Sequence, residues 1–225
     1  MNRTSTANSS MPTAKTCSLN TIKLYRFPLS GHCHRVQLFL SLLGRPVELI
    51  DIDLTQKVQK SPEFLAMNLF GQVPVIQDGA ITMADANAIL VYLAHRYAPD
   101  TWLPHDPAKA AEVQRWLSVA AGLLAFGPSA ARMAVLFKSP VSTVEMIARA
   151  NHLFGVMEAV LTVTPFLIGD NPSLADIANY SYIARAPEGN ISLDPYPKLR
   201  AWLERIEALP GFVPMVVSPI GLNAE

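Results

Sequence analysis

The chain has 225 residues, which is long enough for a sizeable core and for either one domain or two small ones. Half of the residues are hydrophobic and the formal net charge is zero, so neither nucleic acid nor a membrane surface is favoured as a partner. No apolar stretch reaches the roughly eighteen uncharged residues of a membrane-spanning helix, and the two cysteines are too few for a disulfide framework, which favours a reducing, cytoplasmic location.

The first twenty residues are rich in Ser, Thr and Asn and carry no apolar block after Arg3. Such a composition buries too little apolar surface to fold, so we expect a disordered leader and not a secretory signal. We expect the first domain to begin at residue 21.

Apolar periodicity predicts an α/β domain over residues 21–98. The predicted strands cover residues 22–27, 47–52, 73–77 and 80–82, and the predicted helices cover 33–43, a short segment starting at 62, and 85–97. The first two strands should be parallel because a helix connects them. Asp78-Gly79 is the strongest hairpin signal in the chain. The resulting order, β-α-β-α-β-β-α, is that of a thioredoxin-like domain.

Strand signals end after a proline-rich link at residues 99–107. The following helix-period segments cover residues 108–137, 141–163, 174–185 and 199–209. They predict an all-α helical bundle of four or five helices over residues 107–225. Gly127-Pro128 should break or kink its first long helix. Ser173-x-x-Asp176 is a variant of the capping box, which predicts a helix start.

Several motifs together resemble the cytosolic glutathione S-transferase family, in its bacterial form. They are Lys23-Leu24-Tyr25, Ser30-Gly31-His32-Cys33-His34-Arg35-Val36, Ser61-Pro62-Glu63-Phe64, Asn68-Leu69-Phe70-Gly71-Gln72-Val73-Pro74, Asn87-Ala88-Ile89 and Ser173-Leu174-Ala175-Asp176. The resemblance covers nearly all of residues 22–212 and is looser in the helical half. It implies a homodimeric detoxification enzyme that conjugates the thiolate of glutathione, its co-substrate, to small hydrophobic electrophiles.

The turn from Ser30 to Cys33 is the candidate thiol site. Its spacing is that of a C-x-x-C motif with serine first, which argues against an enzyme that uses its own dithiol. The resemblance implies that the Ser30 hydroxyl donates a hydrogen bond to the glutathione thiolate and lowers the thiol pKa by about one to two units. The alternative is that Ser30 only caps the helix.

His32 and Cys33 compete for the same task. A neutral His32 would donate a second hydrogen bond to sulfur, and an imidazolium would stabilise the thiolate more. Cys33 would either have a depressed pKa and form a mixed disulfide with glutathione, or be a small buried apolar residue. We expect His34 and Arg35 to make surface contacts, and we expect no metal site among these crowded side chains.

The resemblance also implies a glutathione-binding edge at Val73-Pro74. A cis peptide bond there would turn the backbone of Val73 toward the cysteinyl backbone of glutathione, whereas the plain alternative is a proline that starts an edge strand. Gln72 is a plausible polar contact beside this proline. Lys60 would bind the glycyl carboxylate, unless it is only a solvated loop lysine.

Asp85-Ala86 is a departure from the family pattern, which usually has an acid followed by serine. Asp85 would bind the γ-glutamyl ammonium group, or act only as a helix cap. Ala86 retains only its backbone N–H for the carboxylate. The missing hydroxyl should weaken glutathione binding roughly ten- to a hundredfold.

The electrophile pocket is expected along residues 116–137, with Phe126 and Arg132 as candidates, although such spacing also fits plain core. Two other functions remain open. One is glutathione-dependent reduction of peroxides or disulfides, which needs the same peptide site and a second thiol. The other is a non-catalytic interaction module with this fold, which the Ala86 departure supports.

Overall fold

The computed structural model describes residues 20–224. The leader expected at residues 1–20 therefore lies, except for Asn20, outside the described residues. The N-terminal half contains a four-stranded mixed sheet in the order β2-β1-β3-β4. Its strands are β1 (Ile22–Arg26), β2 (Val47–Asp51), β3 (Val75–Asp78) and β4 (Ile81–Ala84). β1 pairs in parallel with β2 and antiparallel with β3, which pairs antiparallel with β4, so the predicted thioredoxin-like order is confirmed.

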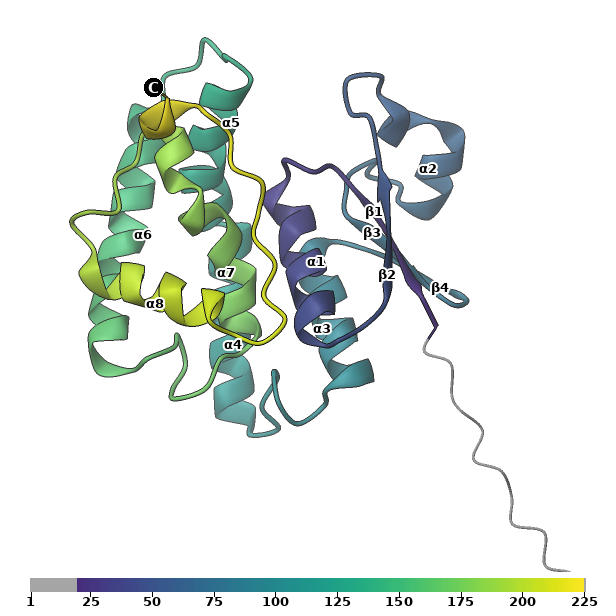
Figure 1. The fold of residues 1–225 in the computed structure, drawn as a ribbon, viewed down its shortest axis with the longest axis horizontal. Helices are drawn as coiled ribbons and strands as arrows, with labels where there is room; N and C mark the ends of the chain where they lie inside the picture. Colours follow the sequence, from purple (N-terminus) through teal and green to yellow (C-terminus); the bar gives the residue numbers. More distant parts are fainter. Residues whose placement is uncertain (1–19, 225) are drawn as a thin grey trace, which may run out of the picture.

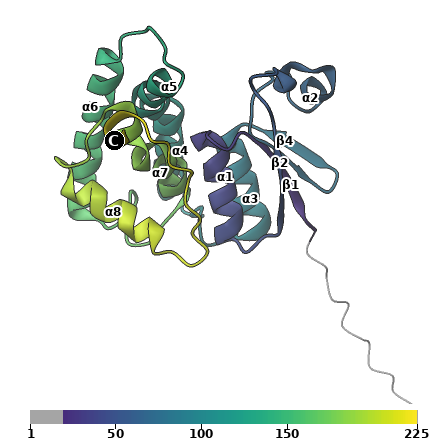
Figure 2. The same ribbon diagram turned by 45° about the horizontal axis from the view of Figure 1, so that its top comes forward.

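Helices cover both faces of this sheet. α1 (Gly31–Leu42) and α3 (Ala86–Tyr97) lie between the sheet and the helical half, whereas α2 (Pro62–Met67) and the short turn η1 (Val58–Lys60) lie on the other side (Figures 1 and 2). Ser61 caps α2 by accepting a hydrogen bond from Phe64 N, and Pro62 occupies the first helical turn, as expected. Both helix starts used by the site, at Ser30 and Asp85, are capped in the same way.

The second half is entirely helical, as expected. Its elements are α4 (Pro107–Ala121), η2 (Ala125–Ser129), α5 (Ala130–Leu136), α6 (Val144–Val163), α7 (Leu174–Ala184), η3 (Ala186–Gly189), α8 (Pro197–Glu207) and η4 (Gly221–Asn223). The capping box predicted at the start of α7 is present, with Ser173 and Asp176 bonded reciprocally.

The long helix predicted over residues 108–137 is interrupted earlier than expected. α4 ends at Ala121 with Gly122 as its C-cap, and Gly127-Pro128 lie within the π-helical turn η2 that leads into α5. Pro128 has no N–H to donate, which favours a wider turn at this point. Gly127 also packs closely on α6, because a Cβ there would lie 3.1 Å from Ala150 N.

The segment at residues 107–136 is, within the described chain, the one helical run long and apolar enough to cross a membrane. Nearly half of its most apolar stretch, 44%, is buried inside the protein, and α4 packs against α7. We therefore interpret it as the core helix of the bundle.

One continuous hydrophobic core joins the two halves. It contains residues of β1, α1 and α3, such as Leu24, Phe39 and Leu90, together with Trp116 of α4 and Trp202 of α8. A smaller cluster of Ile52, Phe64 and Val75 lies under α2. The first turn of α1 is thus held against the helical half by shared packing.

The C-terminal segment after α8 returns to α1 (Figure 1, yellow). Its Gly211 carbonyl accepts a hydrogen bond of 2.6 Å from Ser41 Oγ, and its Val213 carbonyl lies 2.9 Å from His34 Nε2. His34 Nδ1 lies 2.9 Å from Ser181 Oγ of α7. The expectation that His34 makes surface contacts is therefore wrong, because this imidazole is buried between three elements.

Candidate active site

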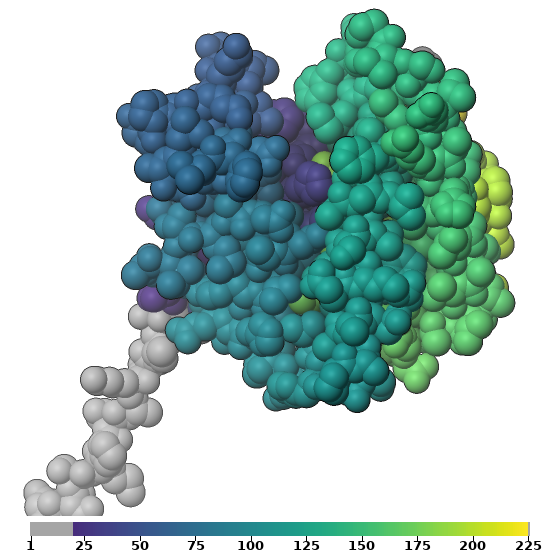
Figure 3. All heavy atoms as spheres, turned by 180° about the vertical axis from the view of Figure 1, so that it is seen from behind, coloured from purple at the N-terminus to yellow at the C-terminus, as the bar shows by residue number. Residues whose placement is uncertain are grey.

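A cavity of about 560 Å³ lies between the two halves. In the space-filling view it opens as a cleft between the blue N-terminal domain and the teal helices α4 and α5 (Figure 3). Ser30, His32, Arg35 and Tyr182 line it, together with Phe27, Leu29, Leu54, Gln59, Lys60, Gly71, Gln72, Val73, Pro74, Asp85, Ala86, Asn87, Ala121, Ala125, Arg132, Met133, Leu136 and Phe137. Polar groups gather on its N-terminal wall and apolar ones on its helical wall, which suits a polar ligand beside an apolar one.

Ser30 caps α1 and also lines this cavity. Its Oγ accepts a hydrogen bond of 3.3 Å from Cys33 N, which uses one lone pair of the hydroxyl. The O–H proton is not consumed by this contact, because a hydroxyl donates and accepts independently. Capping the helix and donating to a ligand are therefore compatible for Ser30.

His32 lines the same cavity, and its ring packs edge-to-face on Tyr182 with centroids 5.1 Å apart. Burial, and secondarily the charge of Arg35, lower the pKa of His32 from 6.5 to about 3. The imidazole is therefore neutral at physiological pH. The imidazolium alternative is wrong, and only donation from a neutral ring remains open to His32.

Cys33 is 1% exposed and is not among the residues that line the cavity. Its Sγ accepts a hydrogen bond from Phe27 N, and burial raises the pKa of its thiol to about 11. The hypothesis of a reactive Cys33 with a depressed pKa is therefore wrong. The position of Cys33 gives no support to a catalytic role. Cys33 is instead the small buried apolar residue that the sequence offered as the alternative.

Arg35 was expected at the surface and is instead 1% exposed, lining the cavity beside α3. Its Nη1 donates a hydrogen bond of 2.7 Å to Asn87 Oδ1, whereas Nε and Nη2 have no hydrogen-bond partner within residues 20–224. Burial lowers the pKa of Arg35 to about 10, so the guanidinium stays charged at neutral pH. Its helical spacing to Leu38 and Phe39, which are buried on α1, was the available signal for this inward position.

The residues expected to bind glutathione lie together along one wall of the cavity, and they are Lys60, Gln72, Val73, Pro74, Asp85 and Ala86. The Val73–Pro74 peptide bond is cis. None of the hydrogen bonds formed among the described residues involves the backbone of Val73, so its N–H and C=O are available to a ligand.

Asp85 and Ala86 form the N-terminus of α3 at this wall. Asp85 has a left-handed φ of 72°, and its carboxylate accepts a hydrogen bond of 2.9 Å from Ala88 N. The backbone N–H groups of the first helical turn remain an anion site. Lys60 Nζ donates to the Phe70 carbonyl at 2.9 Å, which places its ammonium group over the same wall.

Of the two electrophile-pocket candidates, the structure places only Arg132 at the cavity. Phe126 is 62% exposed and is not among the lining residues, so that expectation is wrong. The π-helical turn η2 widens the helix there, and Ala125 takes the inward position instead. Met133 and Leu136 of α5 and Phe137, which caps the C-terminus of α5, complete the apolar wall.

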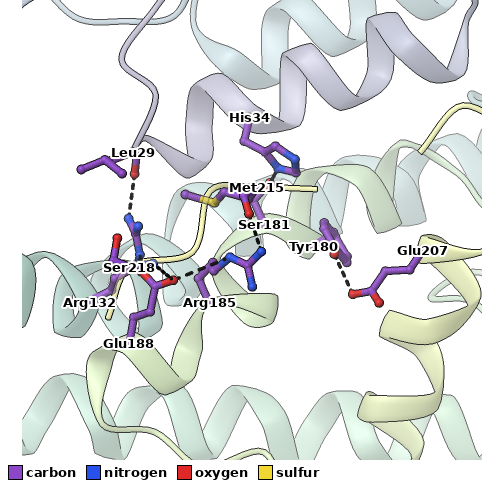
Figure 4. Close-up of polar contacts among 10 residues, drawn as sticks. All are labelled: Leu29, His34, Arg132, Tyr180, Ser181, Arg185, Glu188, Glu207, Met215 and Ser218. Atoms are coloured by element: carbon purple, nitrogen blue, oxygen red, sulfur yellow. Dashed lines mark hydrogen bonds and ion pairs between the residues drawn. The ribbon is translucent and has the colours of Figure 1, made fainter. Parts of the chain in front are cut away.

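Arg132 is a buried link between the two halves (Figure 4). Its Nε donates to Glu188 Oε2 and its Nη1 donates to the carbonyl of Leu29, both at 2.7 Å. Leu29 directly precedes Ser30, so this contact fixes the loop that carries the candidate hydroxyl. Glu188 also accepts a hydrogen bond from Ser218 N and lies 3.7 Å from Arg185 Nε.

The part of the chain that the structure describes contains no group of three or more His, Cys, Asp or Glu side chains placed to hold a metal ion. The cavity itself is lined by hydroxyl, imidazole and guanidinium groups and by the backbone N–H groups at the start of α3. These are hydrogen-bond donors that stabilise an anion, such as a thiolate, in a partly dry site.

Comparisons with known proteins agree with this geometry. Two family models match the chain: the N-terminal domain of glutathione S-transferases over residues 24–101 and the C-terminal domain over residues 139–210. Glutathione S-transferase 3 of Zea mays is 35% identical over 210 residues, which cover 85% of this chain and 91% of the relative.

Solved structures give the same result. A glutathione S-transferase from Pseudomonas fluorescens superposes with a TM-score of 0.82 at 31% identity, covering 88% of this chain and all of the other. A glutathione transferase homologue from Drosophila mojavensis, solved with bound glutathione, has a TM-score of 0.77 at 29% identity, covering 84% of this chain and 89% of its own. With this fold, this cavity and these relatives, the chain belongs to the glutathione S-transferase family.

Proposed function

We propose that the enzyme binds glutathione along the Val73–Pro74 edge and conjugates its sulfur to small hydrophobic electrophiles held against α4 and α5. The Ser30 hydroxyl donates a hydrogen bond to the sulfur and stabilises the thiolate. Asp85 binds the γ-glutamyl ammonium group, and the N–H of Ala86 binds the γ-glutamyl carboxylate. The observation that carries this proposal is that Ser30, Val73 and Asp85 all line one cavity.

Lys60 and Gln72 complete the peptide site, with the Lys60 ammonium group facing the glycyl carboxylate. The division of labour follows the two halves: residues 21–98 bind glutathione, and residues 107–225 supply the electrophile pocket. Arg132, Met133 and Phe137 line that pocket. Met133 and Phe137 are apolar and the Arg132 guanidinium is paired with Glu188, so this wall favours a small aryl or alkyl electrophile over a charged one.

We also propose a cytoplasmic homodimer. Leu69 and Phe70 are 88% and 81% exposed on the loop before Val73, although both are large and apolar. Large apolar side chains exposed side by side form a patch of the kind that occurs at protein–protein contacts. A second copy of the chain is the partner that the family membership favours.

The test is an ultraviolet titration of the thiolate band of bound glutathione. We expect the wild-type enzyme to ionise bound glutathione about one to two pKa units below the free thiol, and Ser30→Ala to lose this shift. Cys33→Ala is the matched control and should retain the band, because the Cys33 thiol is buried away from the cavity. If Cys33→Ala alone abolishes turnover, the result would favour glutathione-dependent reduction of peroxides or disulfides, and Ser30 would not be the residue that activates the thiol. Glutathione binding without a thiolate band would favour a non-catalytic module.

A further inference from the structure

Tyr182 of α7 is a second hydroxyl at the thiol site. A Cβ atom at position 31 would lie 2.7 Å from Tyr182 Cζ, so the hydroxyl-bearing end of the ring packs directly on Gly31. The same ring meets His32 edge-to-face. The phenol of the helical half therefore lies over the turn that follows Ser30, and position 31 needs glycine to make room for it.

Among the hydrogen bonds formed within residues 20–224, none involves the hydroxyl of Tyr182. The residue as a whole is only 2% exposed, but its oxygen is not among the fully buried polar atoms, and Tyr182 lines the cavity. Tyr180 of the same helix bonds Glu207 Oε1 at 2.8 Å, whereas the Tyr182 hydroxyl is left available to a group in the cavity. A group bound in the cavity is the partner that this geometry offers.

The neighbouring charge favours an anion as that partner. Arg35 forms no ion pair with any carboxylate of the described chain within 4 Å, and two of its nitrogens have no acceptor. Tyr182 and Asp85 are among the groups that raise the pKa of Arg35 against the effect of burial, so the phenol lies within the field of this cation. A buried cation with no carboxylate within ion-pair distance attracts negative charge to the adjoining space.

We propose that Tyr182 is a further catalytic residue, whose hydroxyl donates a hydrogen bond to the sulfur of bound glutathione alongside that of Ser30. This inference rests on the proposed function and deepens it, because the thiolate is then held by one hydroxyl from each half of the molecule. The thiol proton passes to water, while both hydroxyls keep their own protons. The sulfur retains its electron pair, which forms the bond to the electrophilic carbon; with chlorodinitrobenzene the carbon–chlorine bond then breaks and chloride leaves with that bond's electron pair.

The test uses Tyr182→Phe, which removes the hydroxyl and keeps the ring that packs on Gly31 and His32. We expect the pKa of bound glutathione to rise by about one unit, and kcat/KM with chlorodinitrobenzene to fall roughly tenfold at about pH 6.5. The loss should disappear at about pH 9.5, where the thiol ionises unaided. Tyr180→Phe is the matched control: it removes a buried hydroxyl from the same helix and should leave the thiol pKa unchanged.

An unshifted thiol pKa in Tyr182→Phe would overturn the inference, even if kcat fell, because the phenol would then act on the electrophile or only on packing. A shifted pKa in Ser30→Ala beside an unshifted one in Tyr182→Phe would overturn this inference alone. A wild-type enzyme without a thiolate band would overturn the proposed function, and this inference with it.

Discussion

In the proposed glutathione complex, Ala86 offers the γ-glutamyl carboxylate only a backbone N–H, where the family pattern usually adds a hydroxyl. The side chain lines the cavity at the N-terminus of α3. Ala86→Ser restores the missing donor, so we expect it to strengthen glutathione binding about tenfold, as one charge-assisted hydrogen bond would. Titration calorimetry with glutathione checks this. An unchanged or weaker affinity would show that the carboxylate lies elsewhere.

At the scale of single residues, the sequence predicted several of the residues that line the cavity and missed others. The positions of Ser30, Val73 and Asp85 were predictable because motifs and caps are local features of the chain. Those of Arg35 and Tyr182 were not, because α7 and α1, which pack together, are about 150 residues apart. An arginine next to two histidines in a first helical turn looks solvated until another domain covers it.

At the scale of elements, His34 links α1, α7 and the C-terminal segment. Because a carbonyl only accepts, His34 Nε2 donates to Val213 O and Nδ1 accepts from Ser181 Oγ, which defines a neutral tautomer. Burial lowers the pKa of His34 to about 4, and the nearby charges of Arg185, Arg35 and Arg26 act in the same direction. The contacts of His34 therefore require a neutral imidazole.

This neutral link predicts loss of stability in acid. Above pH 6.5 the ring is neutral in both states; between 6.5 and about 4 only the unfolded chain takes up the proton, so stability falls as pH falls. The contribution of His34 is at most about 3 kcal/mol. We expect His34→Gln to reduce the difference in urea-unfolding free energy between about pH 7.5 and pH 5 by about 1 to 2 kcal/mol.

The control for this prediction is His152→Gln, which changes an exposed histidine of α6. It should leave the pH dependence of stability as it is in the wild-type enzyme. A pH dependence that is identical in His34→Gln and in the wild type would show that other groups cause the acid destabilisation.

Among the elements, the sequence predicted the type of each helix and strand better than the continuity of the first bundle helix. Proline and glycine marked a break near position 127, where Gly127 packs on Ala150 of α6, but α4 already ends at Ala121. The π-helical turn η2 that follows changes which side chain faces the cavity. Phe126 was misplaced for this reason, whereas Arg132, in the regular helix α5, was not.

At the scale of the whole molecule, the exposed pair Leu69 and Phe70 predicts assembly. Phe70→Ser should shift the enzyme from dimer toward monomer in size-exclusion chromatography with light scattering, because an apolar anchor is lost. Val163→Ser is the control, since Val163 is an 84% exposed apolar residue at the end of α6. A dimer that survives Phe70→Ser unchanged, or a wild-type monomer, would contradict the proposed interface.

The division into an α/β half and a helical half was predictable because periodicity changes once along the chain. The periodicity does not indicate how much apolar surface the two halves bury against each other. The hydrophobic core runs without interruption from β1 through α1 and α3 into α4, α7 and α8. Phe39 is an example: its apolar spacing on α1 is compatible with a domain that folds alone, yet its ring packs on Trp102 in the segment that links the two halves.

That uninterrupted core limits how the enzyme can be divided. A fragment that stops at α3 would expose the apolar sides of α1 and α3 to water, and we expect it to aggregate instead of folding alone. A hybrid enzyme with the helical half of another protein would have to match the apolar sides of α1 and α3 with new side chains. Variation in substrate range is therefore easier to obtain by single replacements on the α5 wall, where Met133 and Leu136 face open space, than by exchange of whole modules.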